Sequence, residues 1–248
     1  MLTLVGLGLW DEKDISLKGL EEVRKADTVY AELYTNIWHG DLKILEKSVD
    51  KKITIVSRKD VEDNSDRMLK EAKTKNVCLL VPGDPLAATT HADILMQAKR
   101  ENIETRIIHA SSIFTAVGES GLQLYKFGKT ATIPLPEKTG GVAPESVYDI
   151  IKNNLELGLH TLLLLDIDIE NNKNLSVKEG LQILQKLDED KVLKGKKIVV
   201  MSLLGSDKQK IKYGKIEDLA KGDFELPAVL ITPGKLHFAE EGLLNKLK

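Results

Sequence analysis

A short loop after an apolar run has the residue types in this sequence that best suit ligand chemistry. The run 77–81 stops at Pro82-Gly83-Asp84-Pro85. Neither proline can donate a hydrogen bond to a β-ladder, so a strand must end here. Gly83 lets another molecule approach the backbone, and Asp84 offers a carboxylate. Open α/β sheets bind ligands at the carboxyl ends of strands, so we expect a binding crevice, with an ordinary strand-to-helix turn as the alternative.

A glycine-containing loop, Gly6-Leu7-Gly8-Leu9, follows the first apolar run. It matches the start of a dinucleotide-binding fingerprint, but Asp11 stands where that fingerprint requires a third small residue. Glu32, at the end of the next apolar run, matches the acid that contacts the ribose in such folds. A nicotinamide-dependent oxidoreductase is therefore one interpretation, and plain turn glycines are the other.

Further polar loops follow other apolar runs. His109-Ala110-Ser111-Ser112-Ile113 comes after the run that ends at Ile108, and its hydroxyls and amides suit either a polar ligand group or a helix cap. Pro233-Gly234-Lys235-Leu236-His237 repeats the Pro-Gly pair of the loop at Asp84. Both loops are candidates for the same ligand site.

Several common site types are not indicated. Residues 123–130 end in Gly-Lys-Thr like a phosphate loop, but Gln123 replaces the first glycine and a strand follows instead of a helix. The sequence has no Gly-x-Ser-x-Gly elbow. The histidines form no pair at metal-binding spacing, so we expect no metal site; they are His39, His91, His109, His160 and His237.

Composition fits a chain of one large or two small domains. It has 248 residues, of which 42% are hydrophobic and 30% charged, with a formal net charge of -2. Nucleic-acid binders usually carry a basic excess, so no nucleic-acid partner is expected. The only cysteine, Cys78, lies in an apolar run and is expected to be a buried thiol in a reducing compartment. With no membrane-length apolar run and no basic leader, we expect a cytoplasmic protein that contacts no membrane.

Strand and helix patterns alternate along the chain, which predicts an α/β fold with a parallel sheet in the first half. The expected strands are residues 2–5, 28–31, 53–56, 77–81, 105–108, 131–133, 161–165, 197–201 and 228–232. Ser16 is expected to cap a helix with Leu17, Leu20 and Val23 on its buried face, and helices are also predicted over 90–100 and 147–157. Ser176 and Glu179 form a capping box before another helix. We expect two α/β domains, 1–110 and 111–248, with a ligand cleft between them.

Taken together, these loops resemble those of the archaeal-type diphthine synthases, within the wider tetrapyrrole-methylase superfamily. The resemblance runs from about residue 2 to about residue 240. The Gly-x-Gly and Pro-Gly-Asp-Pro pieces are shared with the whole superfamily. More specific to the diphthine branch are Ala88-Thr89-Thr90-His91 and Tyr125-Lys126-Phe127-Gly128-Lys129. The matching segments also include His160 to Asp166 and Pro233 to His237.

The resemblance implies a two-domain methyltransferase, usually a homodimer, that binds S-adenosylmethionine in the cleft between its domains. The implied substrate is a histidine of translation elongation factor 2 that already carries a 3-amino-3-carboxypropyl group. Repeated methylation of its amino nitrogen gives the trimethylammonium group of diphthine. A tetrapyrrole C-methyltransferase of the same superfamily is the alternative, which the diphthine-specific motifs disfavour.

The resemblance also assigns cofactor contacts by position. They are Leu9, Asp84, Ala87, Ser112, Ile113, Leu165, Leu203 and Ala228. Many relatives have an arginine near Leu203, and Ser111 stands where relatives often have proline. Ala228 is aligned by counting back from Pro233, with Pro227 as the other choice.

The catalytic candidates are Asp84 and His91. Methyl transfer from a sulfonium to an amine needs positioning more than a strong acid or a metal. Asp84 could attract the sulfonium or bind a polar group of the cofactor. His91 could relay the protons that the amine must lose between rounds.

Overall fold

The computed structural model describes residues 1–142 and 144–247. The chain divides into two compact units, unit 1 (Met1–Phe114) and unit 2 (Thr115–Lys248). The sequence predicts this boundary between residues 110 and 111. Each unit has its own sheet and its own hydrophobic core, so each can be described by itself.

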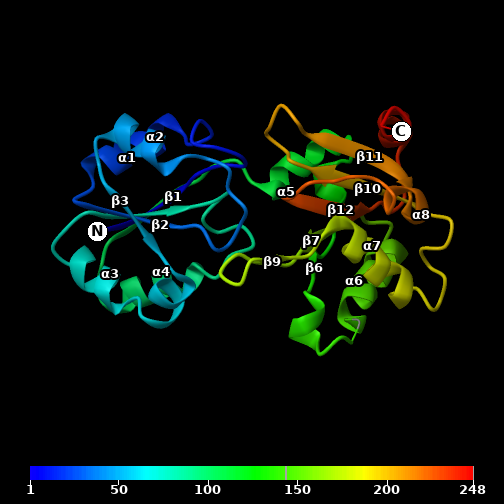
Figure 1. The fold of residues 1–248 in the computed structure, drawn as a ribbon, viewed down its shortest axis with the longest axis horizontal. Helices are drawn as coiled ribbons and strands as arrows, with labels where there is room; N and C mark the ends of the chain where they lie inside the picture. The colour runs from blue at the N-terminus through cyan, green and yellow to red at the C-terminus, as the bar shows by residue number, and fades with distance from the viewer. Residues whose placement is uncertain (143, 248) are drawn as a thin grey trace. The chain divides into compact units, whose positions relative to one another are not determined.

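Unit 1 is built on a five-stranded sheet in the order β3-β2-β4-β1-β5, in which every neighbouring pair is parallel (Figure 1). Its strands are β1 (Leu2–Gly6), β2 (Thr28–Glu32), β3 (Ile53–Val56), β4 (Val77–Val81) and β5 (Thr105–Ile108). All residues of β1 and β4 are buried, as expected of central strands covered on both faces. The predicted parallel α/β sheet is confirmed.

The helices of unit 1 cover both faces of this sheet. They are α1 (Leu17–Lys25), α2 (Leu42–Val49), α3 (Asp66–Ala72) and α4 (Ala92–Arg100), with a π-helical turn, η1 (Lys59–Asp63), before α3. Val23 and Leu45 from α1 and α2 belong to one core cluster, whereas Leu69 and Ile94 from α3 and α4 belong to the other. The crossovers that leave β1 and β4 therefore turn to opposite faces. Because β1 and β4 are neighbours, their carboxyl ends form a topological switch point.

Helix α1 has the predicted N-cap, but its buried face is not the predicted one. The Ser16 hydroxyl accepts the backbone N–H of Gly19, as an N-cap should. Leu17, however, is 80% exposed, and the buried positions are Gly19, Glu22 and Val23. A Cβ added to Gly19 would lie 2.9 Å from Val5, so the helix packs closely on β1 at this point. Leu17, two residues earlier, therefore points away from the sheet.

Unit 2 has a mixed five-stranded sheet in the order β11-β10-β12-β7-β6. Its strands are β6 (Ala131–Ile133), β7 (Thr161–Leu165), β10 (Lys197–Ser202), β11 (Lys210–Lys215) and β12 (Ala228–Thr232). Only the β6–β7 pair in this sheet is parallel; the other neighbouring pairs are antiparallel. Helices α6 (Glu145–Glu156) and α7 (Val177–Leu187) pack on it, and the predicted capping box of Ser176 and Glu179 is present.

Shorter elements complete the chain. They are α5 (Ile113–Ala116), η2 (Val117–Ser120), η3 (Leu124–Lys126), η4 (Pro136–Thr139), β8 (Ile167–Asp168), β9 (Lys173–Asn174), α8 (Ile216–Leu219) and α9 (Phe238–Leu244). Edge strand β11 was not predicted, because its sequence Lys-Ile-Lys-Tyr-Gly-Lys has no apolar run. Lysines on an edge strand discourage pairing with another chain.

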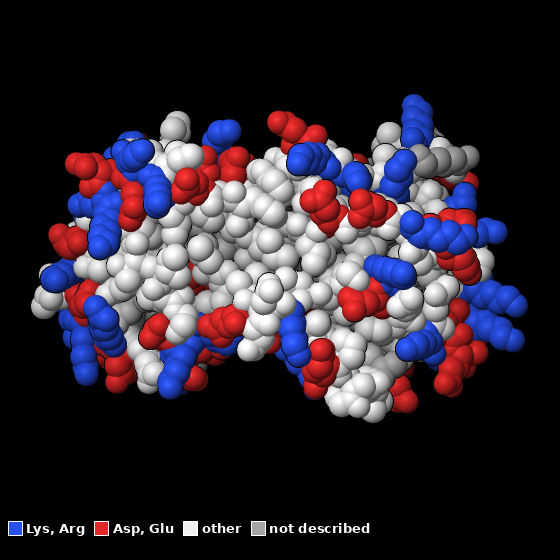
Figure 2. Space-filling model, viewed as in Figure 1, with Lys and Arg blue, Asp and Glu red and all other residues white. Residues whose placement is uncertain are grey.

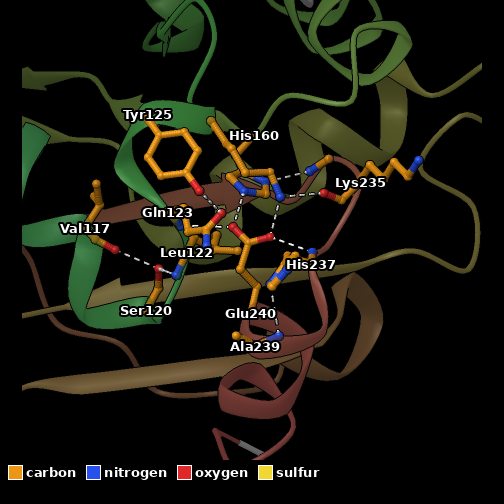
Figure 3. A network of polar contacts seen from close by, with 12 residues as sticks. Val117, Ser120, Leu122, Gln123, Tyr125, His160, Lys235, His237, Ala239 and Glu240 are labelled. Carbon is orange, nitrogen blue, oxygen red and sulfur yellow. Dashed lines mark hydrogen bonds and ion pairs between the residues drawn. The ribbon is translucent and has the colours of Figure 1, made fainter.

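A buried polar network joins three of the matched motifs in unit 2 (Figure 3). His160, just before β7, and Glu240, in α9, are both 0% exposed. The His160 Nε2 lies 2.9 Å from Glu240 Oε1, and the Lys126 ammonium pairs with the other carboxylate oxygen. The backbone N–H of Gln123 and of His237 also donate to Glu240. The Glu240 carboxylate in α9 therefore joins the segment of Gln123 and Lys126 to His160 at the start of β7.

The network also fixes the charge states of its members. The backbone N–H of Gly234 donates to His160 Nδ1, so the ring proton lies on Nε2 and faces Glu240. Burial lowers the pKa of His160. Glu240 raises it, but this effect is smaller than that of burial. Burial alone would raise the pKa of Glu240, but the N–H of His237 and the Lys126 ammonium outweigh it and lower the pKa to about 2. Glu240 is therefore ionised and fully hydrogen-bonded.

Replacing Glu240 should destabilise the protein strongly. Glu240→Gln leaves the Lys126 ammonium without its carboxylate, and loss of one partner of a buried pair costs about 3 kcal/mol or more. We expect this loss in the free energy of unfolding at neutral pH, measured by urea denaturation. The wild-type contribution should be present above pH 4.5 and fade as the pH falls towards 2, because the folded-state pKa is the lower one.

The matched control is Glu241→Gln, the neighbouring exposed glutamate in α9. It should change the free energy of unfolding little. Equal stability of Glu240→Gln and the wild type at neutral pH would show that the network contributes nothing.

Candidate functional site

The loops that follow β1 and β4 meet backbone to backbone at the switch point. The Gly8 N–H donates to the Gly83 carbonyl at 3.2 Å, and the Gly83 N–H donates to the Gly8 carbonyl at 2.8 Å. A Cβ on Gly6 would lie 2.6 Å from both the Gly83 oxygen and the Ala110 Cβ. Glycine is therefore required here for three loops to approach one another.

Gly83 differs from these tightly packed glycines. It has a φ of +69°, yet a Cβ built on it would have no heavy atom of the described residues within 4 Å. Packing inside unit 1 thus leaves one side of the loop open. An open side on a glycine at a switch point fits a ligand that approaches the backbone closely.

Asp84 holds this region together. Residues 82–91, which we call the Asp84 loop, connect β4 to α4. The Asp84 carboxylate accepts the N–H of Leu86 on Oδ1 at 3.0 Å. Its Oδ2 accepts the N–H of Ala110 at 3.2 Å and lies 2.8 Å from His109 Nδ1. With only 12% of the side chain exposed, Asp84 mainly positions the loops after β4 and β5.

The other unit 1 candidates gather at the same edge. Half-buried Leu9 follows Gly8, and the N–H of Ala87 closes a turn onto the Asp84 carbonyl at 3.1 Å. Ser112 is buried and its hydroxyl accepts the Phe114 N–H, so it caps α5, which begins at Ile113. The structure therefore brings all five predicted residues of unit 1 to the carboxyl edge of one sheet.

The unit 2 candidates gather at one edge of the second sheet. Ala228 pairs with Ser202, and the adjacent Leu203 donates its N–H to the Pro227 carbonyl at 2.9 Å. Leu165 ends β7, the strand that pairs with β12. Leu203 is 2% exposed with a φ of +54°, an unfavourable conformation for a leucine. Strained residues of this kind often mark ligand sites.

Two side chains that were singled out from the sequence are buried below the loops. Glu32 is 0% exposed and its carboxylate accepts the N–H of Tyr34 and Thr35, so it is not placed to bind a ribose. His91 is 1% exposed and lies beside Glu32. Burial lowers the pKa of His91. The Pro85 carbonyl and the charge of Glu62 only partly offset this lowering. His91, the last residue of the Asp84 loop, is therefore buried inside unit 1.

Motifs in the second half of the chain contribute to packing. In the Tyr125–Lys129 motif, Lys126 pairs with Glu240, and a Cβ on Gly128 would lie 2.2 Å from Asn154 Oδ1. Sequence reasoning did not single out Glu240. The available signal was a capping box, in which Glu240 is the third residue after the N-cap His237.

Other features limit the possible chemistry. In the described ranges 1–142 and 144–247, no group of three or more His, Cys, Asp or Glu side chains is arranged to hold a metal ion. Within those residues no helix is long and apolar enough to span a membrane. Cys78 is buried as predicted, and burial raises the pKa of its thiol to about 12. Acidic and basic side chains are interspersed on the face drawn in Figure 2.

Known proteins resemble this chain along its whole length. Residues 1–220 match the family model for tetrapyrrole (corrin/porphyrin) methylases. The diphthine synthase of Methanocaldococcus jannaschii is 48% identical and aligns with 100% of this chain and 98% of its own length. That of Methanosarcina barkeri is 46% identical, with coverage of 100% and 96%. A crystal structure of diphthine synthase superposes with a TM-score of 0.90 at 40% identity, covering 99% of this chain and 95% of that one.

Family model, sequence relatives and solved structure agree with one another, and they agree with the loops assembled at the switch point. The chain belongs to the diphthine synthases, a branch of the tetrapyrrole methylase family, and is a methyltransferase.

Proposed function

We propose that this protein transfers methyl groups from S-adenosylmethionine to the amino nitrogen of a 3-amino-3-carboxypropyl-histidine on translation elongation factor 2. The observation that carries the proposal is the open side of Gly83, at the switch point of a chain that belongs to the diphthine synthases. The resemblance further implies three methylations of the same nitrogen and a homodimer.

The residues present suit the methyl donor. Leu9, Ala87 and Ile113 are apolar and half-buried, which suits the adenine ring of the donor. We expect the polar part of the donor to lie at the open side of Gly83, where it could reach backbone groups. On the second sheet, Leu165, Leu203 and Ala228 are the further contacts that we propose. The ligand cleft between the domains stays a prediction.

The protein's own contribution to the reaction is positioning. S-adenosylmethionine supplies a methyl group on a positively charged sulfur, and the amine supplies the electron pair for the new bond. The Asp84 carboxylate holds two loops in fixed relation through the N–H of Leu86 and Ala110. Fixed geometry of this kind can lower a two-reactant barrier by about 7–11 kcal/mol in favourable cases.

The proposed reaction can be tested directly on its substrate. Purified protein, labelled S-adenosylmethionine and elongation factor 2 bearing the unmethylated side chain are incubated together. We expect mass spectrometry to show successive methyl additions at the modified histidine, because its amine offers a lone pair again after each proton loss. Elongation factor 2 with an unmodified histidine is the control and should gain no mass. Absence of methylation on the modified protein would refute the proposed substrate.

The role of Asp84 is testable by binding. In Asp84→Asn an amide nitrogen replaces one carboxylate oxygen and cannot accept the N–H groups of Leu86 or Ala110. We expect S-adenosylhomocysteine, measured by titration calorimetry, to bind about tenfold more weakly or worse, since a lost buried hydrogen bond costs about 1–3 kcal/mol.

Asp149→Asn, at an exposed position of α6, is the control and should bind like the wild type. If Asp84→Asn kept wild-type affinity and turnover, the loop contacts of Asp84 would have no part in binding.

A further inference from the structure

A paired histidine and aspartate stand at the carboxyl edge of the unit 1 sheet. His109 is the first residue after β5, and its Nδ1 lies 2.8 Å from Asp84 Oδ2. The Asp84 side chain is 12% exposed, whereas the His109 side chain is 68% exposed. The carboxylate thus holds one side of the imidazole, and the rest of the ring is open to solvent. Holding two loops together does not by itself require the partner of Asp84 to be a histidine.

The other contacts of Asp84 determine which ring nitrogen of His109 carries the proton. Asp84 Oδ1 accepts the Leu86 N–H, and Oδ2 accepts the Ala110 N–H. Because both carboxylate oxygens already act as acceptors, the His109 Nδ1 is the donor in the third contact. The neutral ring then presents Nε2 as an unprotonated acceptor. Among the residues that the structure describes, Nε2 has no hydrogen-bond partner.

The loop that carries His109 takes part in the close approach at the switch point. A Cβ added to Gly6 would lie 2.6 Å from the Ala110 Cβ, so the residue after His109 packs against the loop that follows β1. Asp84, which holds the ring, directly follows Gly83, the glycine with an open side. The imidazole therefore belongs to the edge of the sheet where ligands of such folds bind.

The proposed reaction contains a step that positioning alone does not perform. An amine is largely protonated near neutral pH, and a protonated nitrogen has no electron pair for a new bond. Each methylation leaves the nitrogen positively charged, so a proton must leave again before the next one. A proton acceptor must therefore contact the amine before every transfer. Imidazole is the side chain that enzymes use most often for this purpose.

The two buried histidines are less suited to that step. His91, which the sequence suggested for it, is 1% exposed, so its ring has little access to an arriving amine. His160 is 0% exposed, and its two ring nitrogens are engaged with Glu240 and with the Gly234 N–H. His109 instead combines an exposed acceptor nitrogen with a carboxylate that orients the ring.

We propose that His109 is a catalytic residue for methyl transfer: Asp84 holds its Nδ1, and its Nε2 accepts a proton from the substrate amine before each transfer. The inference rests on the proposed function, which supplies the amine. In each round an N–H bond breaks and its proton moves to Nε2. The freed electron pair forms the bond to the methyl carbon, while the C–S bond breaks and its electrons stay on sulfur. The charged ring then releases the proton to water through its exposed side.

The test separates proton removal from the loop contact by replacing His109 with asparagine. In His109→Asn the amide nitrogen lies near the former Nδ1 and can still donate to Asp84, but no atom replaces Nε2. S-adenosylhomocysteine binding, measured by calorimetry, should match that of the wild type. The kcat for methylation of the modified elongation factor 2 should fall about 100-fold or more, because general-base catalysis contributes about 10²–10⁴-fold.

A second variant tests whether the missing group is an imidazole. His109→Ala removes the whole ring from an exposed position, so a free imidazole molecule can enter in its place. We expect imidazole added to the reaction to restore part of the kcat of this variant. The wild type should gain nothing, because its own ring already accepts the proton. A loss caused only by loop distortion would not respond to imidazole.

The matched control is His237→Asn, the same substitution at another exposed histidine. The His237 ring accepts the Ala239 N–H as the N-cap of α9, and asparagine is a favourable N-cap residue. We expect this variant to keep the wild-type S-adenosylhomocysteine affinity and the wild-type kcat.

The outcomes distinguish this inference from the proposed function. A wild-type kcat in His109→Asn would overturn the role of His109 and leave the proposed function intact. The same holds if imidazole has no effect on a His109→Ala protein that binds S-adenosylhomocysteine. If the wild type methylated no modified elongation factor 2, the proposed function and the role of His109 would both fail.

Nitrogen NMR of the ligand-free wild type is a readout that does not depend on turnover. The neutral His109 ring should carry its proton on Nδ1, because that nitrogen faces Asp84. In Asp84→Ala this preference should be lost. A neutral wild-type ring with its proton on Nε2 would have no acceptor facing the substrate and would contradict the proposal.

Discussion

The structure of unit 1 depends on the close backbone contact between Gly8 and Gly83. Neighbouring parallel strands β1 and β4 send their crossovers to opposite faces of the sheet, so their loops diverge just beyond this contact. Side chains at Gly6 or Gly8 would collide with the adjoining loops, whereas Gly83 has open space beside it. The chain thus brings several backbone segments together at a point where packing leaves one side for a ligand.

In each of the two units, a carboxylate acts mainly as a structural acceptor. Asp84 joins the loops after β4 and β5, and Glu240 joins loop, strand and helix in unit 2. The sequence pointed to Asp84 and not to Glu240, yet both are engaged in hydrogen bonds within the protein. For a reaction that moves a methyl group between two bound molecules, a framework that fixes geometry matters more than a reactive side chain.

Much of the fold was predictable because its central strands are continuous apolar runs with Pro, Gly or Asp at their ends. The same punctuation located the loops of Leu9, Asp84, Ala87 and Ser112, which unit 1 gathers at one edge of its sheet. Strand β11 was missed because an edge strand buries little and so keeps its lysines. Leu17 was misplaced because the close packing of Gly19 on β1, which sets the buried face of α1, is a tertiary contact. The Glu32–His91 contact joins residues far apart in the sequence, and no local pattern could indicate it.

The solitary thiol of Cys78 gives this molecule a natural reporter. It lies in the fully buried strand β4, next to the switch point, and a pKa near 12 keeps it un-ionised in the folded state. Because only the thiolate reacts readily, an alkylating reagent can label it only in molecules whose unit 1 has opened. The rate of labelling therefore reports how often the sheet of unit 1 opens. No engineered probe is needed, and no second cysteine would be labelled.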